Sequence, residues 1–349
     1  MAIDLQNVLR ITEPRQRDSS GRIWFVPFNI TFRCELNCQF CYGKDRIDGE
    51  MSTEEVKKHV IDNIVNSKAK WLGFTGGDPL LRDDIFELMS YAKERGLNVL
   101  LSTNGALLNK ERIARLKAIG VTRLGIGISG LKDVYKKVMG GGEFESIDTV
   151  LRLLVSEGFE VSLRSVPTRQ NISTFLDLVD YAHELGVYKF CRYNMIYSGK
   201  ANRSMDISDK YKNRLTMDLV DKQKQYPDLK IWLMERPFDN VLLSRFGYGD
   251  AIKRIGTGKC GATKELINVA PNGDVYPCPY FFDSMQPIGN LKVDNISDLA
   301  MSDARICSEQ NITGICGECE HIDICNGCRY HALKFGNNIC GGDPFCPIM

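Results

Sequence analysis

Three cysteines lie close together near the start of the chain, in the stretch CELNCQFCYG: Cys34, Cys38 and Cys41. Cysteine thiolates are soft ligands that suit zinc and iron–sulfur clusters. A tetrahedral metal ion and a cubane cluster both take four ligands, so three thiols leave one position for another molecule. The spacing therefore favours a cluster with one iron open to a substrate. A zinc ion with a distant fourth ligand, or three buried thiols without metal, are the alternatives.

A second group of cysteines lies near the end of the chain. Of the 13 cysteines in the sequence, nine lie beyond residue 259. The first residues lack the apolar segment of a signal peptide, and no run of about 18 apolar residues could cross a membrane. We therefore expect a cytoplasmic protein, and in a reducing cytosol clustered cysteines are more often metal ligands than structural disulfides. The sequence predicts two separate metal-binding regions.

The composition is that of an ordinary soluble globular protein, with 43% hydrophobic and 26% charged residues. The length of 349 residues exceeds what one core usually fills, which predicts one large domain and a smaller one. A net charge of +1 provides no electrostatic case for binding nucleic acid or a membrane surface. We expect neither as a partner.

Residues 23–197 alternate short apolar runs with amphipathic stretches of helical period. The apolar runs occupy residues 22–30, 71–74, 97–102, 123–129, 159–166 and 188–196. Several helical stretches end in a glycine suited to a left-handed C-cap: Gly96, Gly120, Gly158 and Gly186. Ser52 or Thr53, and Ser173, are placed to cap helices at their start. Six such units predict an α/β fold, a partial (β/α)6 barrel similar to a TIM barrel.

Polar and glycine-rich loops follow the first four predicted strands. The cysteine triplet follows the first strand, TGGDP (75–79) the second, STNG (102–105) the third and SG (129–130) the fourth. Because the carboxyl ends of parallel strands meet at one rim of a barrel, these loops should lie together. We take this rim as one site.

The remaining segments carry weaker signals. Residues 1–22 form an N-terminal extension, and residues 198–258 are polar, with one helical stretch at about 208–226, so we expect a linker or bridge there. Residues 259–349 are rich in Cys, Gly, Asn, Asp and Pro and show little helical period. Because such a segment rarely builds a sufficient core, we expect a small domain that metal crosslinks stabilise.

The triplet, with Phe40 inside it, resembles the CxxxCxxC motif of the radical S-adenosylmethionine (radical SAM) enzymes. The resemblance implies that Cys34, Cys38 and Cys41 are both the ligands of a [4Fe–4S] cluster and the catalytic residues. In this family SAM chelates the open iron, and the reduced cluster cleaves it to methionine and a 5′-deoxyadenosyl radical. That radical abstracts hydrogen from the substrate. An external electron donor, similar to flavodoxin or ferredoxin, is implied as a partner.

The other rim loops extend the resemblance to the SAM-binding positions of the family. Four residues resemble its Gly-Gly-Glu-Pro motif, which holds the SAM amino group, with Asp in place of Glu: Gly76, Gly77, Asp78 and Pro79. The expected cofactor-binding set also includes Phe40, Tyr42, Ser102, Asn104, Ser129 and Arg164. Other interpretations are open. Asp78 could cap the helix that begins near DDIFELM, Ser129 could be a strand-end hydroxyl, and Arg164 could belong to a surface ion pair.

The C-terminal cysteines resemble the SPASM extension of this family, which carries two auxiliary [4Fe–4S] clusters. The matching residues are Cys260, Cys278, Cys316, Cys319, Cys325, Cys328 and Cys346. The resemblance implies one cluster on Cys316, Cys319, Cys325 and Cys346, and the other on Cys260, Cys278 and Cys328. The fourth position of the latter is left open between Cys307, Cys340 and substrate, while Cys191 lies inside a strand and should be buried. A zinc ribbon would need a longer gap between its CxxC pairs.

SPASM enzymes act mostly on peptides and proteins, and one branch acts on tetrapyrroles of the haem and haem d1 pathways. Pro279 occupies the position at which sulfatase-maturating enzymes carry an Asp, which argues against that activity. About 22 residues precede the first strand, so leader recognition would need another protein or another surface. We predict peptide or protein modification, with tetrapyrrole modification as the alternative. A non-catalytic iron–sulfur electron carrier or a zinc scaffold would not need TGGDP and STNG on the rim of the triplet.

Overall fold

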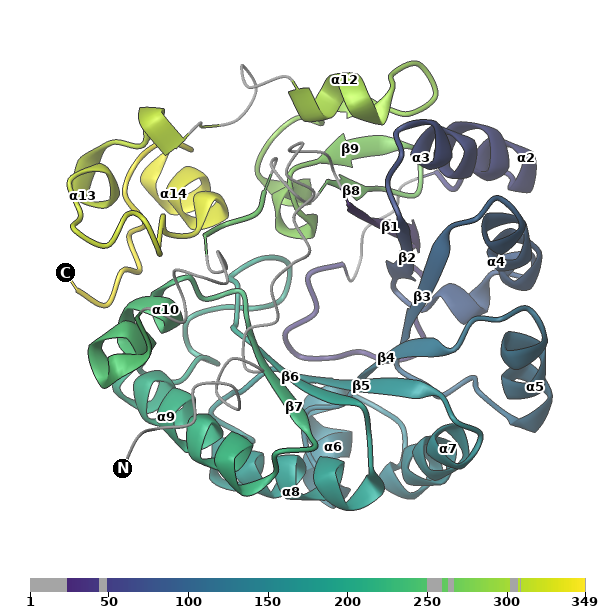
Figure 1. Cartoon of the computed structure of the whole chain (residues 1–349), viewed down its shortest axis with the longest axis horizontal. Helices are drawn as coiled ribbons and strands as arrows, with labels where there is room; N and C mark the ends of the chain where they lie inside the picture. Colours follow the sequence, from purple (N-terminus) through teal and green to yellow (C-terminus); the bar gives the residue numbers. More distant parts are fainter. Residues whose placement is uncertain are drawn as a thin grey trace.

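Seven parallel strands form a curved sheet that lines the inside of an open barrel (Figure 1). The structure is a computed structural model that describes residues 24–43, 49–249, 259–262, 267–301, 307 and 309–348. The N-terminal extension predicted for residues 1–22 lies outside the described residues. The barrel strands are β1 (Phe25–Thr31), β2 (Trp71–Gly76), β3 (Asn98–Thr103), β4 (Arg123–Gly127), β5 (Glu160–Ser165), β6 (Lys189–Tyr193) and β7 (Lys230–Met234). Each strand pairs in parallel with the next one along the chain.

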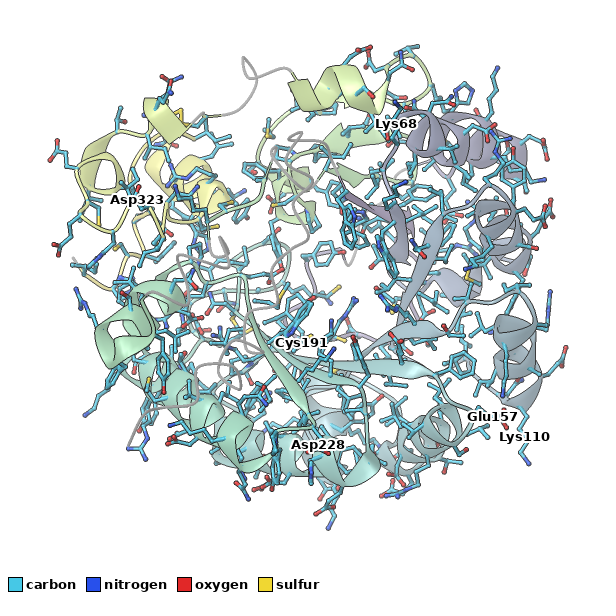
Figure 2. All side chains as sticks on the ribbon, in the orientation of Figure 1. Lys68, Lys110, Glu157, Cys191, Asp228 and Asp323 are labelled. Carbon is cyan, nitrogen blue, oxygen red and sulfur yellow. A yellow bond between two sulfur atoms is a disulfide. The ribbon has the colours of Figure 1, made fainter. Side chains whose placement is uncertain are left out.

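Amphipathic helices cover the outer side of this sheet (Figure 1). They are α2 (Thr53–Glu55), a π-helical segment (Val56–Ile61), α3 (Asp62–Asn66), α4 (Ile85–Glu94), α5 (Lys110–Ala118), α6 (Lys132–Met139), α7 (Phe144–Ser156) and α8 (Phe175–Leu185). Exposed charged residues such as Lys110 and Glu157 lie on the outside (Figure 2). The strands are apolar along much of their length because both faces of a parallel sheet are covered. The predicted α/β class with a parallel, curved sheet is confirmed.

Local signals place most of the helix ends correctly. Positive φ, which favours glycine, occurs at each of the predicted C-caps: Gly96, Gly120, Gly158 and Gly186. Ser52 caps α2, because its side chain accepts from the N–H of Glu55 and its own N–H donates back to the Glu55 carboxylate. The prediction for Ser173 is wrong. It lies inside a short 3₁₀ turn (Ile172–Thr174), since the Asn171 side chain already organises a tighter turn ahead of α8.

The segment 198–258, expected as a bridge, carries a further helix and strand of the barrel. The helical stretch predicted at about 208–226 is α9 (Asp209–Gln225). It is followed by β7, which pairs in parallel with β6, and by α10 (Phe238–Leu243). β7 has only five residues, KIWLM, most of them partly exposed, so its sequence lacks the long apolar run of a central strand.

The C-terminal region is joined to the barrel through the same sheet. β8 (Asn268–Val269) pairs in parallel with β1, and β9 (Asp274–Tyr276) and β10 (Gly289–Asn290) continue the sheet antiparallel. The buried Asn29 side chain on β1 donates a hydrogen bond of 3.0 Å to Asn268 Oδ1. The helices of this region are α12 (Ile296–Met301), α13 (Gly314–Gly317) and α14 (Arg329–Gly336). None of the helices formed by the described residues is long and apolar enough to span a bilayer.

Candidate active site and auxiliary cysteine sets

The cysteine loop (residues 32–43), which follows β1, is fixed first by the loop that follows β2. The Gly77 N–H donates to the Thr31 carbonyl and the Asp78 N–H to the Arg33 carbonyl, each at 2.7 Å. The two loops approach each other so closely that no side chain would fit at Gly76 or Gly77. A Cβ at Gly76, where φ is +135°, would lie 2.0 Å from the Thr31 carbonyl oxygen, and one at Gly77 would lie 2.1 Å from that of Arg33. Close backbone approach is therefore the role of both glycines.

Two further elements hold the other side of the cysteine loop. The Gln39 N–H donates to the Val138 carbonyl at 3.2 Å, near the end of α6. The Lys200 N–H, from the loop after β6, donates to the Cys41 carbonyl at 3.0 Å. Gly199, with φ of +60°, permits this contact, because a Cβ there would lie 2.5 Å from the same carbonyl. Backbone hydrogen bonds from three elements thus define the path of the loop.

The three thiols of this loop interact with one another and are partly buried. Burial is the main cause that raises the pKa of Cys34 to about 11 and of Cys38 to about 12, and the neighbouring thiols add to it. Thiols with such pKa values stay protonated at neutral pH, so binding of a metal must release their protons. The Asn104 side-chain amide donates to Cys34 Sγ at 3.7 Å, and Phe40 packs half-buried against the core.

Asp78 is fully buried and accepts three hydrogen bonds from the protein. Its carboxylate accepts from the Leu80 N–H at 3.0 Å, the Thr103 hydroxyl at 2.6 Å and the Asn104 N–H at 3.0 Å. Burial raises the pKa of Asp78 to about 6, although these donors favour the charged form. Asp78 caps the short 3₁₀ turn Pro79–Leu81, which precedes the helix suggested as its structural alternative. Its contact with SAM stays a prediction.

Arg164 and Ser102 meet on the inner side of the barrel, where Arg164 Nη1 donates to Ser102 Oγ at 2.7 Å. Gly125 on the intervening strand makes room for the guanidinium, since a Cβ there would lie 2.3 Å from Arg164 Cζ. Ser129 is buried, and its hydroxyl accepts from the Val166 N–H at 3.1 Å. The structure thus brings Ser102 and Arg164 together, while Ser129 makes the strand-end hydrogen bond considered as its alternative role.

An aromatic cluster links the cysteine loop to the C-terminal region. The Tyr42 hydroxyl donates to Asn29 Oδ1 at 2.7 Å, and its ring packs on Tyr280 and Phe282, with centroids 5.6 and 6.5 Å apart. Phe282 also packs edge-on against Phe32 at 5.4 Å. The aromatic run PYFF directly after Cys278 was the available signal for this contact.

Glu235 is a further residue that sequence reasoning missed. It follows β7 with φ of +66°, a left-handed conformation that is uncommon for residues other than glycine. Its carboxylate accepts a hydrogen bond of 2.6 Å from the Tyr280 hydroxyl, two residues beyond Cys278. Burial and this carboxylate raise the pKa of Tyr280, so the phenol stays protonated. No signal marked Glu235, because β7 was not recognised as a strand.

The C-terminal cysteines fall into two groups by their mutual electrostatic interactions. The three-cysteine set is Cys260, Cys278 and Cys328, and the four-cysteine set is Cys316, Cys319, Cys325 and Cys346. Burial raises the pKa of Cys278 and Cys328 in the first set and of Cys325 and Cys346 in the second, and other members of the same set add to each shift. Among the described residues, no three His, Cys, Asp or Glu side chains lie close enough to hold one metal ion. The grouping is the one that the SPASM resemblance implies, and the roles of these residues as ligands stay predictions.

The remaining cysteines, Cys191, Cys307 and Cys340, belong to neither set. Cys307 and Cys340 form a disulfide, so neither sulfur is available as the fourth ligand of the three-cysteine set in this structure. Cys191 is 3% exposed on β6, in the wall of the barrel (Figure 2), as predicted. The fourth position beside Cys260, Cys278 and Cys328 has no candidate cysteine among the described residues.

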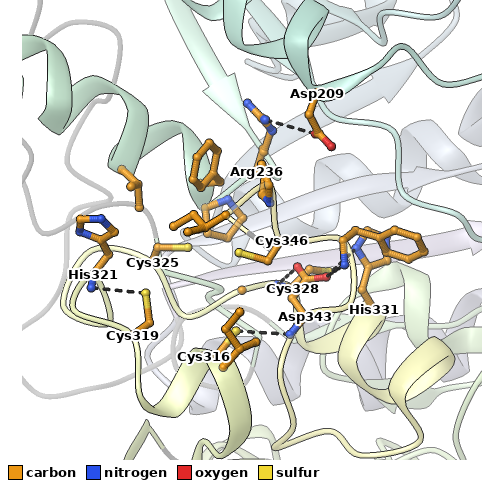
Figure 3. A pocket seen from close by; sticks show the side chains of 18 of the residues that line it. Asp209, Arg236, Cys316, Cys319, His321, Cys325, Cys328, His331, Asp343 and Cys346 are labelled. Carbon is orange, nitrogen blue, oxygen red and sulfur yellow. Dashed lines mark hydrogen bonds and ion pairs between the residues drawn. The ribbon is translucent and has the colours of Figure 1, made fainter.

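A cavity of about 370 Å³ lies between the ends of β6 and β7 and the four-cysteine set (Figure 3). Asp343 forms part of the cavity wall and is hydrogen-bonded to one cysteine of each set. The Asp343 N–H donates to Cys316 Sγ at 3.3 Å, and its carboxylate accepts from the Cys328 N–H at 2.8 Å. His331 lies beside this carboxylate, with Nδ1 3.6 Å from Asp343 Oδ1.

Known proteins resemble this chain over both its barrel and its C-terminal region. The model of the radical SAM superfamily matches residues 28–182, and that of the SPASM iron–sulfur cluster-binding domain matches residues 260–337. An AdoMet-dependent heme synthase from Nitratidesulfovibrio vulgaris is 27% identical over 94% of this chain and 93% of its own length. A mycofactocin maturase from Mycobacterium ulcerans is 28% identical over 92% of this chain and 87% of its own length.

The fold is also found in a solved structure, that of Streptococcus suis SuiB bound to the precursor peptide SuiA. It aligns with a TM-score of 0.74 at 17% identity, over 90% of this chain and 73% of SuiB. The fold, the domain models and the cysteine loop together define an iron–sulfur enzyme that uses SAM. The chain belongs to the radical SAM superfamily and carries a C-terminal SPASM domain.

Proposed function

We propose that Cys34, Cys38 and Cys41 hold the [4Fe–4S] cluster to which SAM binds. When bound, this cluster supplies the electron that cleaves SAM to the 5′-deoxyadenosyl radical. The observation that supports the assignment is the backbone framework of the cysteine loop, which keeps three partly buried thiols on the rim. The Asn104 amide already donates to one of them, as a group that faces a thiolate should.

The remaining rim residues are proposed to bind SAM. Gly76 and Gly77 present backbone groups on the loop that touches the cysteine loop, and Asp78 orients Asn104. Ser102 and Arg164, which meet on the inner wall, are placed to bind the polar parts of the cofactor. Phe40, Tyr42 and Ser129 complete the proposed set.

The SPASM domain is proposed to hold two more [4Fe–4S] clusters, on the three-cysteine and four-cysteine sets, giving three clusters in all. These clusters would supply sites that exchange single electrons with the substrate. The Tyr42–Tyr280 contact, which joins the cysteine loop to the residues after Cys278, supports a path between the two regions. We further propose a cytoplasmic enzyme with an external flavodoxin-like or ferredoxin-like donor. The expected iron content is about twelve per chain.

We propose a peptide or protein as the substrate. The charges of the residues that line the cavity support this choice. Its two cations are already in ion pairs, Lys212 with Asp206 and Arg236 with Asp239. Its acidic residues are Asp209, which also forms an ion pair with Arg236, and Glu235, Glu318, Glu320 and Asp343. A tetrapyrrole with several carboxylates would meet net negative charge there, whereas a peptide backbone can donate hydrogen bonds to such groups. The similarity to the mycofactocin maturase supports the same choice.

The alternative is modification of a tetrapyrrole side chain. It is favoured by the similarity to the heme synthase, which covers nearly the whole of both chains. Aromatic side chains also line the cavity, where Tyr197, His331 and Phe345 pack against one another.

One anaerobic experiment separates the two substrate classes. The reconstituted, reduced protein is incubated with SAM and either a peptide encoded by a neighbouring gene or an iron porphyrin that carries propionates. 5′-Deoxyadenosine and the mass of each candidate substrate are then measured. We expect 5′-deoxyadenosine formation to rise with the peptide, together with a change in peptide mass. Turnover of the porphyrin, with a shift of its Soret band on binding, would overturn the peptide proposal in favour of the alternative.

A further inference from the structure

Arg329 is a buried cation without an anion beside it among the described residues. It is the first residue of α14, directly after Cys328, and is 2% exposed. Its Nη1 donates to the carbonyls of Ile339 and Gly341, at 3.0 and 2.7 Å. Its Nε and Nη2 are buried and make no hydrogen bond in the part of the chain that the structure describes. A buried charge in this state is costly unless an anion faces it.

The unpartnered side of Arg329 faces the four-cysteine set. Gly327, with φ of +65°, marks a small space where a side chain would not fit. A Cβ there would lie 2.9 Å from Arg329 Nη2, 3.0 Å from Cys316 Sγ and 2.8 Å from Asp343 Cβ. The guanidinium and the Cys316 sulfur therefore border the same space. Once a metal binds, that sulfur is a thiolate and part of an anionic cluster.

The carboxylate nearest to this space is already engaged. Asp343 accepts from the N–H groups of Cys328 and Phe345, at 2.8 and 3.0 Å, and lies beside His331. Beyond the effect of burial, its negative charge raises the pKa of Cys328 in one set and of Cys325 and Cys346 in the other, so it acts on both sets. Asp343 therefore does not distinguish the two sets, whereas the unpartnered side of Arg329 borders the space beside Cys316 of the four-cysteine set.

We propose that Arg329 is the counter-cation of the cluster on the four-cysteine set, and that it makes this cluster easier to reduce than the cluster on the three-cysteine set. Reduction adds one negative charge, which a buried cation a few ångströms away stabilises strongly. Hydrogen bonds to cluster sulfurs act in the same direction. The inference rests on the proposed ligand sets and adds to them an ordering of the two potentials. Arg329 acts through the cluster and is a positioning residue.

The test is an EPR-monitored redox titration of the full chain in which Cys34, Cys38 and Cys41 are replaced by Ala, so that only auxiliary signals remain. Adding Arg329→Gln should lower the ratio of reduced to oxidised cluster at least tenfold for one cluster at a fixed potential, which is 59 mV for one electron. Arg329→Lys, which keeps the charge, should restore most of this shift. The control is Arg245→Gln, an exposed cation 3.4 Å from His321, whose effect water should screen.

Two outcomes would overturn the proposal: unchanged potentials in an Arg329→Gln protein with full iron content, or equal shifts for Gln and Lys. If Arg329→Gln fails to bind iron, the chain with Arg329 intact provides the second measurement. Labelled with ¹⁵N-arginine and reduced, it should show weak hyperfine coupling of a guanidinium nitrogen to one cluster in pulsed EPR. Absence of that coupling would equally overturn the proposal. Iron and sulfide contents, measured on each sample, show separately whether the ligand sets themselves are wrong.

Discussion

The cysteine loop of the barrel and the C-terminal cysteine sets hold their thiols by different means. Around the cysteine loop, backbone hydrogen bonds arrive from the loop after β2, from α6 and from the loop after β6. The C-terminal thiols lie in or between short elements, such as α13, which has four residues and carries Cys316. The barrel frame therefore fixes the loop that carries its three thiols, whereas we expect the order of the C-terminal thiols to depend on the clusters that they are proposed to bind.

The apolar cores show the same contrast. The barrel strands and helices share one extended core of buried residues, which reaches from Val26 to Leu299. The core around the three-cysteine set consists of Ile196, Ala262, Ala270, Tyr276, Phe281 and Tyr330. A core this small stabilises little by itself, so metal binding should provide much of the folding free energy of residues 309–348, whereas residues 267–299 share the barrel core.

The largest expected effect is in the barrel loop. Replacing Cys34, Cys38 and Cys41 by Ala should abolish formation of 5′-deoxyadenosine and leave about eight irons per chain on the other two clusters. Because the loop is held by backbone groups, the far-UV circular dichroism should hardly change. Liquid chromatography of the nucleoside and iron analysis check both parts. Persistent 5′-deoxyadenosine would contradict the assignment of this loop as the SAM cluster site.

The matched double substitution in the C-terminal region should remove an auxiliary cluster but leave SAM cleavage intact. Cys316→Ser with Cys319→Ser should remove about four irons and expose residues 309–348 to limited proteolysis, because the cluster that orders them is lost. SAM cleavage should continue without formation of the final product. Proteolysis with mass mapping and a parallel assay of nucleoside and substrate measure this. Full product formation by this variant would mean that the C-terminal region serves only as a scaffold.

A single methyl group tests whether the frame of the cysteine loop is as rigid as its contacts indicate. Gly77→Ala places a Cβ 2.1 Å from the Arg33 carbonyl oxygen, where only backbone could move away. We expect a loss of about 3 kcal/mol in stability and poor occupancy of the barrel cluster. Gly49→Ala is the control, since a Cβ there meets nothing within 4 Å. Equal iron content and equal urea midpoints for the two variants would show that the loop adapts.

The smallest expected effect concerns the pH dependence of stability at Asp78. Burial raises the folded-state pKa of Asp78 from 3.8 to about 6, with Glu35 as the acidic neighbour that adds to the shift. The folded protein then binds the proton more tightly than the unfolded chain, so stability falls as pH rises from about 4 to about 6. Between pH 5 and pH 7 the fall attributable to Asp78 is about 1 kcal/mol.

Urea denaturation at these two pH values measures the Asp78 contribution. Asp78→Asn does not ionise, so its stability should change less between pH 5 and pH 7 than that of the unaltered protein. The matched control is Asp84→Asn, at a carboxyl whose pKa is lowered rather than raised. An identical pH dependence in the unaltered protein and in Asp78→Asn would mean that Asp78 stays ionised throughout this range.

Patterns within short stretches of the sequence were sufficient to predict much of the fold and the position of the cysteine loop. The alternation of apolar runs and amphipathic helices, together with the glycines after the helices, predicts six strands and their order, since pairing in such a sheet follows the chain. The spacing of Cys34, Cys38 and Cys41 is local as well, because all three lie in one loop. Ser173 shows the limit, since the side chain of Asn171 forms a competing turn two residues earlier.

Other features depend on residues far apart in the chain, and only the tertiary structure decided them. β7 is less buried than β4 and β6, which have the same length, so its sequence lacks a clear apolar run. It becomes a strand by pairing with β6, which in turn positions Glu235 against Tyr280. The disulfide between Cys307 and Cys340 removes two cysteines that the sequence left as candidate ligands. The orientation of Arg329 depends on Gly327 and on the loop that carries Gly341. The sequence by itself determined which residues could bind metal and SAM, because those motifs are local. Folding decided which charges and rings face them, because those contacts join segments that no local pattern connects.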